Sequence, residues 1–186
     1  MPPSKSPAAA RPLRVCLDLN IWCGRFLSVK AGRKGSATQM LVNMVRRGRF
    51  EELPVQLIIS WGMLNRLGTV LTREWQVPHD TAELLTGAIA QYASLGPSGL
   101  TPHLLLGGTG VAPLRDVEDA HVLDTAIAGR ADYLVTHDLA DFDHKDLKVI
   151  KPNEEYRCMR GGHELTIIHT YAMLPRLREM TVAGES

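Results

Sequence analysis

Aspartates stand directly after two apolar segments of the sequence. Asp18 follows LRVCL, and Asp138 and Asp141 follow ADYLVT. In an open parallel α/β sheet, the groups that bind ligands gather just beyond the carboxyl ends of the strands. We therefore expect these carboxylates to lie along one rim of a sheet.

Two more aspartates, Asp116 and Asp119, stand at the start of 117–129, a segment with helical spacing. Helix entries and strand exits share one rim in such a sheet, so all these carboxylates can converge. Two carboxylates about 4 Å apart repel by roughly 4 kcal/mol at an effective dielectric constant near 20. A cluster of ionised aspartates therefore implies a hard divalent cation, and oxygen ligands favour Mg²⁺ or Mn²⁺ over zinc.

Short apolar segments alternate with segments of helical periodicity along the chain. The expected strands are 13–20, 55–60, 102–108 and 131–136. The expected helices are 36–48, 61–73, 80–96 (with Asp80 as its N-cap) and 117–129. A final strand lies at either 147–151 or 165–169, and a helix-like segment containing Pro175 follows the second. This alternation predicts an α/β fold in which helices cover both faces of a central, mostly parallel sheet.

The composition is typical of one globular domain, since 45% of the 186 residues are apolar and 22% are charged. We expect this domain to span 13–180, between flexible tails at 1–12 and 181–186. Three scattered cysteines do not form a disulfide framework, which favours reduced thiols in a cytoplasm. No apolar run is long enough to span a membrane.

The charges are distributed unevenly, although the formal net charge is only +1. Residues 116–146 hold nine acids against Arg130 and Lys145, whereas residues 19–50 hold seven basic residues and no acid. The acidic part can hold cations, and the basic part can contact phosphates or simply form solvated helix faces. The basic residues that we expect to bind a nucleic-acid backbone are Arg25, Lys30, Arg33 and Lys34.

Three motifs in this order resemble those of the PIN-domain ribonucleases, particularly the bacterial PIN proteins that are toxins of toxin–antitoxin pairs. The motifs are VCLDLN (15–20), LIIS (57–60) and RDVEDAHVLDTAIAGRADYLVTHDLADF (115–142). The family's D-x-N, D-x-x-D-x-H-V-L and V-T-x-D signatures are all matched, and the resemblance covers most of residues 13–152.

The resemblance implies a PIN-like three-layer α/β/α fold and a ribonuclease that hydrolyses RNA phosphodiester bonds with Mg²⁺ or Mn²⁺. It implies catalytic roles for Asp18, Asp119 and Asp138, and it implies that these three bind the metal with Asp116 as an auxiliary ligand. The implied partners are the RNA substrate and an antitoxin protein, and we expect a homodimer.

Four further residues receive supporting roles from the same resemblance. Asn20 and Ser60 position ligands or phosphate, Thr136 binds a backbone group or water at the site, and Asp141 caps or braces the turn.

The sequence departs from the family at one position. A glutamate usually follows the serine by about six residues, but this stretch holds Asn65 and Arg66, and no acid lies between Glu52 and Glu74. The loss of an anionic ligand weakens metal binding, so a second hypothesis is a degenerate PIN domain that binds RNA or a partner without cleavage. A third hypothesis is a metal-dependent phosphatase or phosphoacceptor domain with Asp18 as nucleophile, but Asn20 replaces the second aspartate expected of a D-x-D phosphotransferase.

Other residues have less specific interpretations. His137 and His144 could join a zinc site, but their spacing is loose and favours surface roles. His121 is expected to be a packed histidine. The stretch GGTG (107–110) lacks the Lys-Ser/Thr end of a phosphate-binding loop, so we expect a mobile loop there.

Overall fold

The computed structural model describes residues 11–104, 117–142 and 147–183. A seven-stranded sheet has the order β2-β3-β1-β4-β7-β6-β5. The four adjacent strands β3, β1, β4 and β7 are parallel, and the pairs β2–β3, β6–β7 and β5–β6 are antiparallel. The strands are β1 Leu13–Leu17, β2 Arg49–Phe50, β3 Leu53–Ile58, β4 Tyr133–Thr136, β5 Lys148–Lys151, β6 Glu155–Arg160 and β7 His163–His169.

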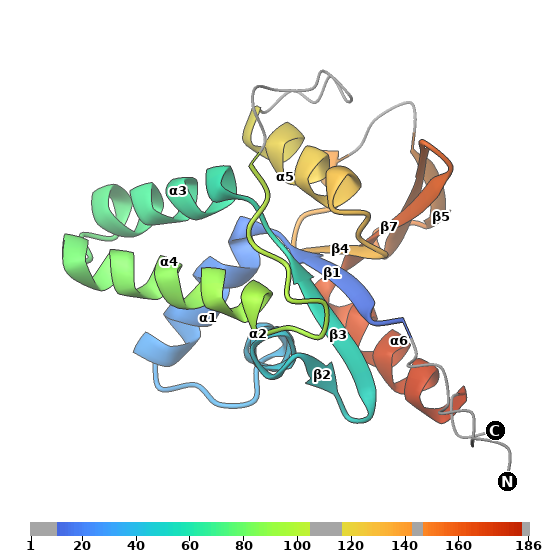
Figure 1. Ribbon diagram of the computed structural model, residues 1–186, viewed down its shortest axis with the longest axis horizontal. Helices are drawn as coiled ribbons and strands as arrows, with labels where there is room; N and C mark the ends of the chain where they lie inside the picture. The colour runs from blue at the N-terminus through green and yellow to red at the C-terminus, as the bar shows by residue number, and fades with distance from the viewer. Residues whose placement is uncertain (1–10, 105–116, 143–146, 184–186) are drawn as a thin grey trace, which may run out of the picture.

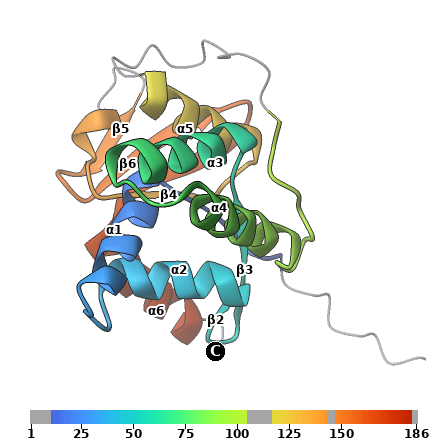
Figure 2. The ribbon, with the colours of Figure 1, turned by 90° about the vertical axis from the view of Figure 1, so that its left-hand side faces the viewer.

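Helices lie on both sides of this sheet. In Figures 1 and 2, α5 covers one face, and α2 and α6 cover the other. The helices α3 and α4 form a pair that projects beside β3 (Figure 1). The helices are α1 Leu19–Lys30, α2 Ala37–Arg47, α3 Trp61–Thr69, α4 His79–Ser94, α5 Val117–Ala128 and α6 Thr170–Ala183, with a π-helical turn Val70–Glu74 and a 3₁₀ turn Ala140–Phe142.

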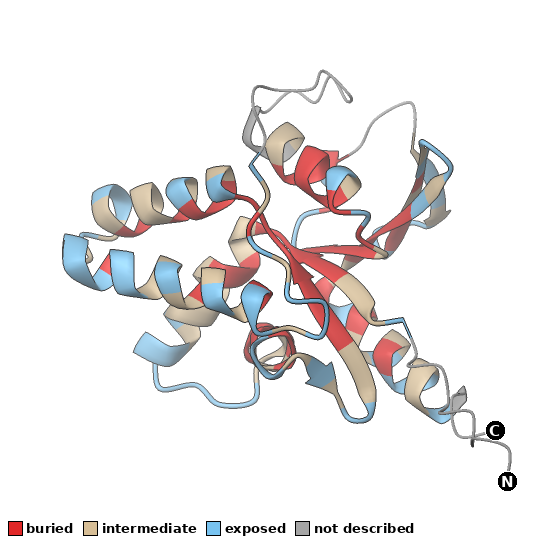
Figure 3. Cartoon of the chain, viewed as in Figure 1, coloured by how far each residue is buried: buried red, intermediate tan, exposed pale blue. Residues whose placement is uncertain are grey.

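The predicted three-layer α/β architecture is confirmed. The parallel strands are buried on both faces, as the red central sheet in Figure 3 shows. Buried parallel strands need continuous apolar sequence, which explains the runs VCL in β1 and YLV in β4. No helix in the described part of the chain is both long enough and apolar enough to cross a membrane.

Local sequence signals position α2 closely. The Ser36 hydroxyl accepts a hydrogen bond from the backbone N–H of Gln39, and the Gln39 side chain accepts one from the backbone N–H of Ser36. This capping box starts the helix. Gly48 ends it in the left-handed conformation, with φ = 65°, which glycine adopts without strain.

Three expectations about elements were wrong. The segment 102–108 forms only an isolated bridge between His103 and Ser60 within its described part, and 105–108 lie outside the described residues. The helix α4 begins one residue before Asp80, with Pro78 at the N-cap, so Asp80 is not the cap. The sequence 18–20 is not strand, because Asp18 caps a helix, α1, that was not expected.

Of the two alternatives for the final strand, 165–169 is confirmed, because it lies in β7. Both segments are strands, and β7 is the one that extends the parallel sheet beside β4. The unexpected β6 pairs with β7 through a turn at Gly161 and Gly162, both with positive φ. Pro175 lies inside α6, where its missing N–H cannot form the usual helical hydrogen bond to the carbonyl of Tyr171.

The order of the strands determines where a site can form. After β1 the chain crosses to β3 on one side, and from β3 it returns to β4 on the other side of β1. The carboxyl ends of β1 and β4 therefore lie next to each other where the direction of winding reverses. Ligands bind in this position in open α/β sheets.

Candidate functional site

Asp18 is the centre of a hydrogen-bonded group at the carboxyl ends of β1 and β4. Its Oδ1 accepts from the backbone N–H of Leu19 at 2.6 Å, so the carboxylate caps α1. Its Oδ2 accepts from the Asn20 side-chain amide at 2.7 Å and from the Thr136 hydroxyl at 2.7 Å. The expected convergence of Asp18, Asn20 and Thr136 is thus present.

Thr136 connects the strand to the turn that follows. Its Oγ1 accepts from the Asn20 amide at 3.0 Å and from the backbone N–H of Asp138 at 3.0 Å. Its backbone carbonyl accepts from the Thr170 hydroxyl at 3.0 Å. Thr136 is fully buried, so its hydroxyl fixes the orientation of the Asp18 carboxylate with little freedom of its own.

The environment of Asp18 opposes a bare negative charge. The side chain is 5% exposed, and burial raises its pKa to about 6, with a smaller increase from the negative charge of Asp141. The hydrogen bonds from Thr136 and Leu19 lower the pKa and offset part of this rise. A nearby cation would stabilise the ionised form.

The turn after β4 carries both Asp138 and Asp141. The Asp138 Oδ1 accepts from the backbone N–H of Ala140 at 3.0 Å, so Asp138 braces the turn. Asp141, on the 3₁₀ turn that follows, is a carboxylate whose negative charge raises the pKa of Asp18. The bracing role expected of Asp141 stays a prediction.

Ser60 lies in the protein interior. It is fully buried and caps α3 by accepting from the backbone N–H of Met63 at 3.2 Å. Its hydroxyl also accepts from the Thr125 hydroxyl at 2.9 Å and lies 3.3 Å from His121 Nε2. These contacts are those of a helix cap, and the expected role of Ser60 in positioning ligands or phosphate stays a prediction.

His121 packs between α5 and α3, as expected of a structural histidine. A Cβ atom at Gly62 would lie 2.0 Å from His121 Nε2, so only glycine leaves room for the ring at this point of α3. This contact fixes α5 against α3. Asp119 belongs to the first turn of α5, but its side chain lies outside the described part, as does all of Asp116.

Two residues, Asn65 and Arg66, stand where the family usually has a glutamate, and their surroundings differ. Asn65 lines a groove of about 420 Å³ between α3 and α4, whereas Arg66 lies near Cys23 of α1 and its Nη2 is 3.7 Å from Glu74 Oε1. Burial, with smaller contributions from the charges of Asp18 and Glu74, raises the pKa of Cys23 to about 11, and Arg66 offsets part of this rise. Arg66 therefore lies near α1, the helix that Asp18 caps.

Cys23 and Glu74 were not expected near the site. Cys23 follows Asp18 by five residues, and this neighbourhood becomes visible only once 19–30 is known to be a helix. Glu74 ends a π-helical turn, a rare conformation that the sequence does not signal.

The four expected phosphate-binding residues do not form one patch. Arg25 lines an apolar groove formed by α1, α2, α3 and α4. Arg33 lines a different groove, beside His137. Lys30 and Lys34 are exposed at the end of α1 and in the loop after it. Only Arg33 is therefore positioned beside the rim that carries Asp18.

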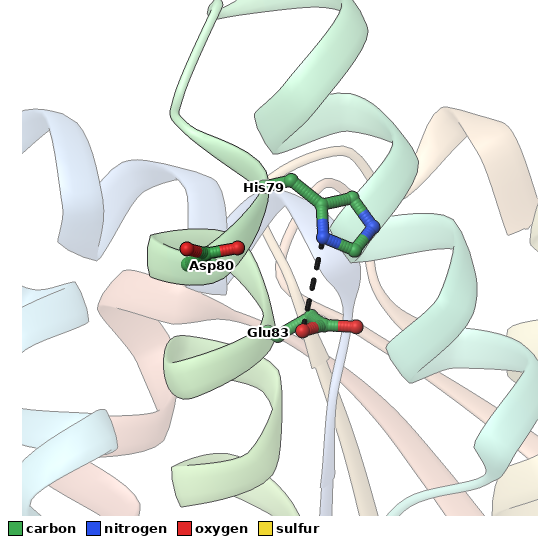
Figure 4. Close-up of side chains that lie close together, drawn as sticks. All are labelled: His79, Asp80 and Glu83. Carbon is green, nitrogen blue, oxygen red and sulfur yellow. Dashed lines mark ion pairs between the residues drawn. The ribbon is translucent and has the colours of Figure 1, made fainter.

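A second acidic group lies on α4. Figure 4 shows His79, Asp80 and Glu83 on the first turn of this helix, with ligand atoms within 4.8 Å of one another. His79 Nδ1 is 3.7 Å from Glu83 Oε2. All three side chains are exposed at the outer end of the α3–α4 pair (Figure 1), where exposed acids are common without an ion. Asp18 instead lies at the sheet rim.

Comparisons with known proteins agree with this description. Searches of curated proteins and of solved structures gave no significant match. A family model described as "PIN domain" matches residues 14–140, which include β1, β4 and the Asp18 group. Because this match covers more than half of the sequence, the chain belongs to the PIN-domain family.

Proposed function

We propose that this protein is a divalent-metal-dependent ribonuclease with Asp18 at the centre of its active site. PIN domains are in general metal-dependent nucleases. The observation that carries the proposal is the buried Asp18 carboxylate, oriented by Asn20 and Thr136 at the junction of β1 and β4.

The side chains around Asp18 suit a hard cation. They offer carboxylate, amide and hydroxyl oxygens, which Mg²⁺ and Mn²⁺ prefer. We propose that Asp18 binds the metal with Asp119, and that Asp116, Asp138 and Asp141 complete or support the ligand set. The raised pKa of Asp18 is consistent with this role, because a cation would compensate the charge that burial disfavours.

The chain's own residues contribute mainly by orientation. Asn20 and Thr136 hold the Asp18 carboxylate in one position, and Asp138 holds the turn that carries Asp141. A bound divalent ion would lower the pKa of water and stabilise the charge that develops on the phosphate. Arg33, beside this rim, would attract the RNA backbone.

The test is cleavage of labelled RNA by the purified protein with Mg²⁺, Mn²⁺ or chelator. We expect cleavage with either ion, none with chelator, and products with phosphate monoester and hydroxyl ends, because water is the nucleophile. Products with 2′,3′-cyclic ends that persist in chelator would reveal a contaminating ribonuclease. Pure protein that leaves structured and unstructured RNA intact with both ions would contradict the proposal.

A second candidate function is RNA or partner binding without cleavage, and Arg66 is the observation that favours it. The positive charge of Arg66, near the helix that Asp18 caps, would oppose the binding of a metal ion at Asp18 by repulsion. Arg66→Glu should therefore strengthen Mn²⁺ binding by about tenfold, and Arg66→Ala by less, since two charges change in the first variant and one in the second. If instead both variants weaken RNA binding and leave Mn²⁺ affinity unchanged, Arg66 contacts phosphate.

We further propose that the protein is a toxin restrained by an antitoxin protein, on the basis of the resemblance. A groove of about 290 Å³ formed by α1, α2, α3 and α4 has an apolar lining with Arg25 and Arg46, and would suit an apolar segment that carries acidic residues. Expression in a bacterial host should arrest growth, and Asp18→Asn should relieve the arrest. Undisturbed growth at high levels of the wild-type protein would argue against a toxin.

A further inference from the structure

Three aromatic side chains, His137, His169 and Tyr171, form a row in space beside the sheet rim that carries Asp18. The ring centroids of His137 and His169 are 6.2 Å apart, and those of His169 and Tyr171 are 5.3 Å apart. The backbone N–H of Tyr171 donates to His169 Nδ1 at 3.3 Å. Tyr171 is 74% exposed and His137 is also exposed, so the row of rings, here called the aromatic shelf, presents surface to solvent.

The aromatic shelf is attached to the site by hydrogen bonds. His137 directly follows Thr136, and its backbone N–H donates to Asn20 Oδ1 at 3.3 Å. Thr170, which lies between the other two shelf residues in the chain, donates to the carbonyl of Thr136. The residues that orient Asp18 therefore also position the shelf.

A groove of about 740 Å³ runs along the shelf. None of the described residues that line it is acidic, and Arg33 is its charged member. A Cβ atom at Gly24 would lie 3.1 Å from Thr38 and 3.5 Å from His137 Nε2, so glycine keeps this groove open at its floor.

The opposite side of the shelf has a mixed charge pattern. His169 and Tyr171 also line a groove of about 300 Å³ whose charged members are Lys151, Glu154, Glu155, Arg176 and Glu179. Arg176 Nη2 lies 2.7 Å from Glu155 Oε2, so cations and carboxylates pair with each other there. The Arg33 groove has no carboxylate among its described lining residues, so a polyanion that reaches the shelf would lie on the Arg33 side.

We propose that the aromatic shelf and the Arg33 groove form a base-binding subsite for an unpaired nucleotide next to the phosphate that is cleaved. This inference rests on the proposed ribonuclease function and names the residues that select the RNA. Aromatic rings bind bases by stacking, which requires an unpaired base and tolerates different sequences.

The test measures binding of a fluorescent single-stranded RNA and of the same sequence as a duplex, in chelator so that no cleavage occurs. Tyr171→Ala should weaken single-strand binding by about tenfold, and Tyr171→Phe should keep it within about twofold, because the phenyl ring still stacks. Duplex binding should be weaker than single-strand binding and unaffected by either variant.

Arg33→Ala should weaken binding and reduce the dependence of log K on log salt concentration by about 0.7. Arg49→Ala is the matched control, because it removes the same charge as Arg33→Ala. Arg49 is exposed on β2 and does not line the groove. This control variant should leave the salt dependence unchanged.

Unchanged single-strand binding in Tyr171→Ala, verified as folded by circular dichroism, would overturn the inference. Equal losses for Arg33→Ala and Arg49→Ala would also overturn it, because the attraction would then not be local. Since binding is measured without metal, a failure of cleavage alone would contradict the ribonuclease and leave the subsite supported.

Discussion

Among single residues, Asp18 makes the clearest prediction, because burial raises its pKa from about 3.8 to about 6. The metal-free folded protein therefore binds this proton more tightly than the unfolded chain does. The resulting stabilisation is fully present below pH 3.8 and is lost as the pH rises through 6. Between pH 4 and pH 7, the free energy of unfolding of wild type should fall by about 2.4 kcal/mol relative to that of Asp18→Asn.

The measurement is urea unfolding of both proteins in chelator across this pH range. Taking the difference between wild type and variant cancels the contributions of the other titrating groups. A difference that stays constant from pH 4 to pH 7 would mean that the environment of Asp18 does not disfavour its charge.

The side-chain contacts near Asp18 show which parts of the site could be predicted from the sequence and which could not. The D-x-N and V-T-x-D motifs correctly predicted that Asp18, Asn20 and Thr136 meet, since strand order and periodicity determine that contact. The bracing contact of Asp138 was not predictable, because it depends on a short 3₁₀ turn whose geometry no apolar pattern signals.

At the level of elements, the contact between α3 and α5 depends on the absence of a side chain at Gly62. Gly62→Ala would place a methyl group against the His121 ring, which is held near Ser60. We expect a loss of about 1–3 kcal/mol in the free energy of unfolding. Gly87→Ala on α4 is the control, because a Cβ atom there meets nothing within 4 Å, and it should stabilise the protein by about 0.5–1 kcal/mol.

Urea unfolding of the two glycine variants separates packing from helix propensity. If both variants are stabilised, the contact between Gly62 and His121 is loose and does not fix α5.

Elements with strong apolar patterns were predictable, and elements with mixed faces were not. Strands β1 and β4 have buried runs that only a sheet interior satisfies. The helix α1 combines exposed Leu27 and Val29 with Gly24 in its middle, so its sequence has no clear helical face. The strand β6 contains exposed Met159 and has no clear apolar pattern. It forms because it pairs with β7, and β7 is held in turn by its pairing with β4, which is distant in the sequence.

For the whole molecule, a bound ion should raise thermal stability. A ligand that binds only the folded state at 100 times its Kd adds about 2.7 kcal/mol, which corresponds to a rise in Tm of about 5–10 °C for a chain of this size. Scanning calorimetry with Mn²⁺ should show this rise in wild type and in Glu83→Gln, but not in Asp18→Asn. A rise that Asp18→Asn keeps and Glu83→Gln loses would place the ion on α4 instead.

The most direct test of the central claim is the rate of Mn²⁺-dependent RNA cleavage by wild type, Asp18→Asn and Asp80→Asn. Both variants remove one carboxylate charge, Asp18 at the junction of β1 and β4 and Asp80 in the exposed group on α4. Loss of cleavage by at least about a hundredfold in folded Asp18→Asn, with the wild-type rate in Asp80→Asn, is the predicted result. Cleavage by folded Asp18→Asn at the wild-type rate would contradict the assignment of Asp18 as the centre of a metal-dependent ribonuclease.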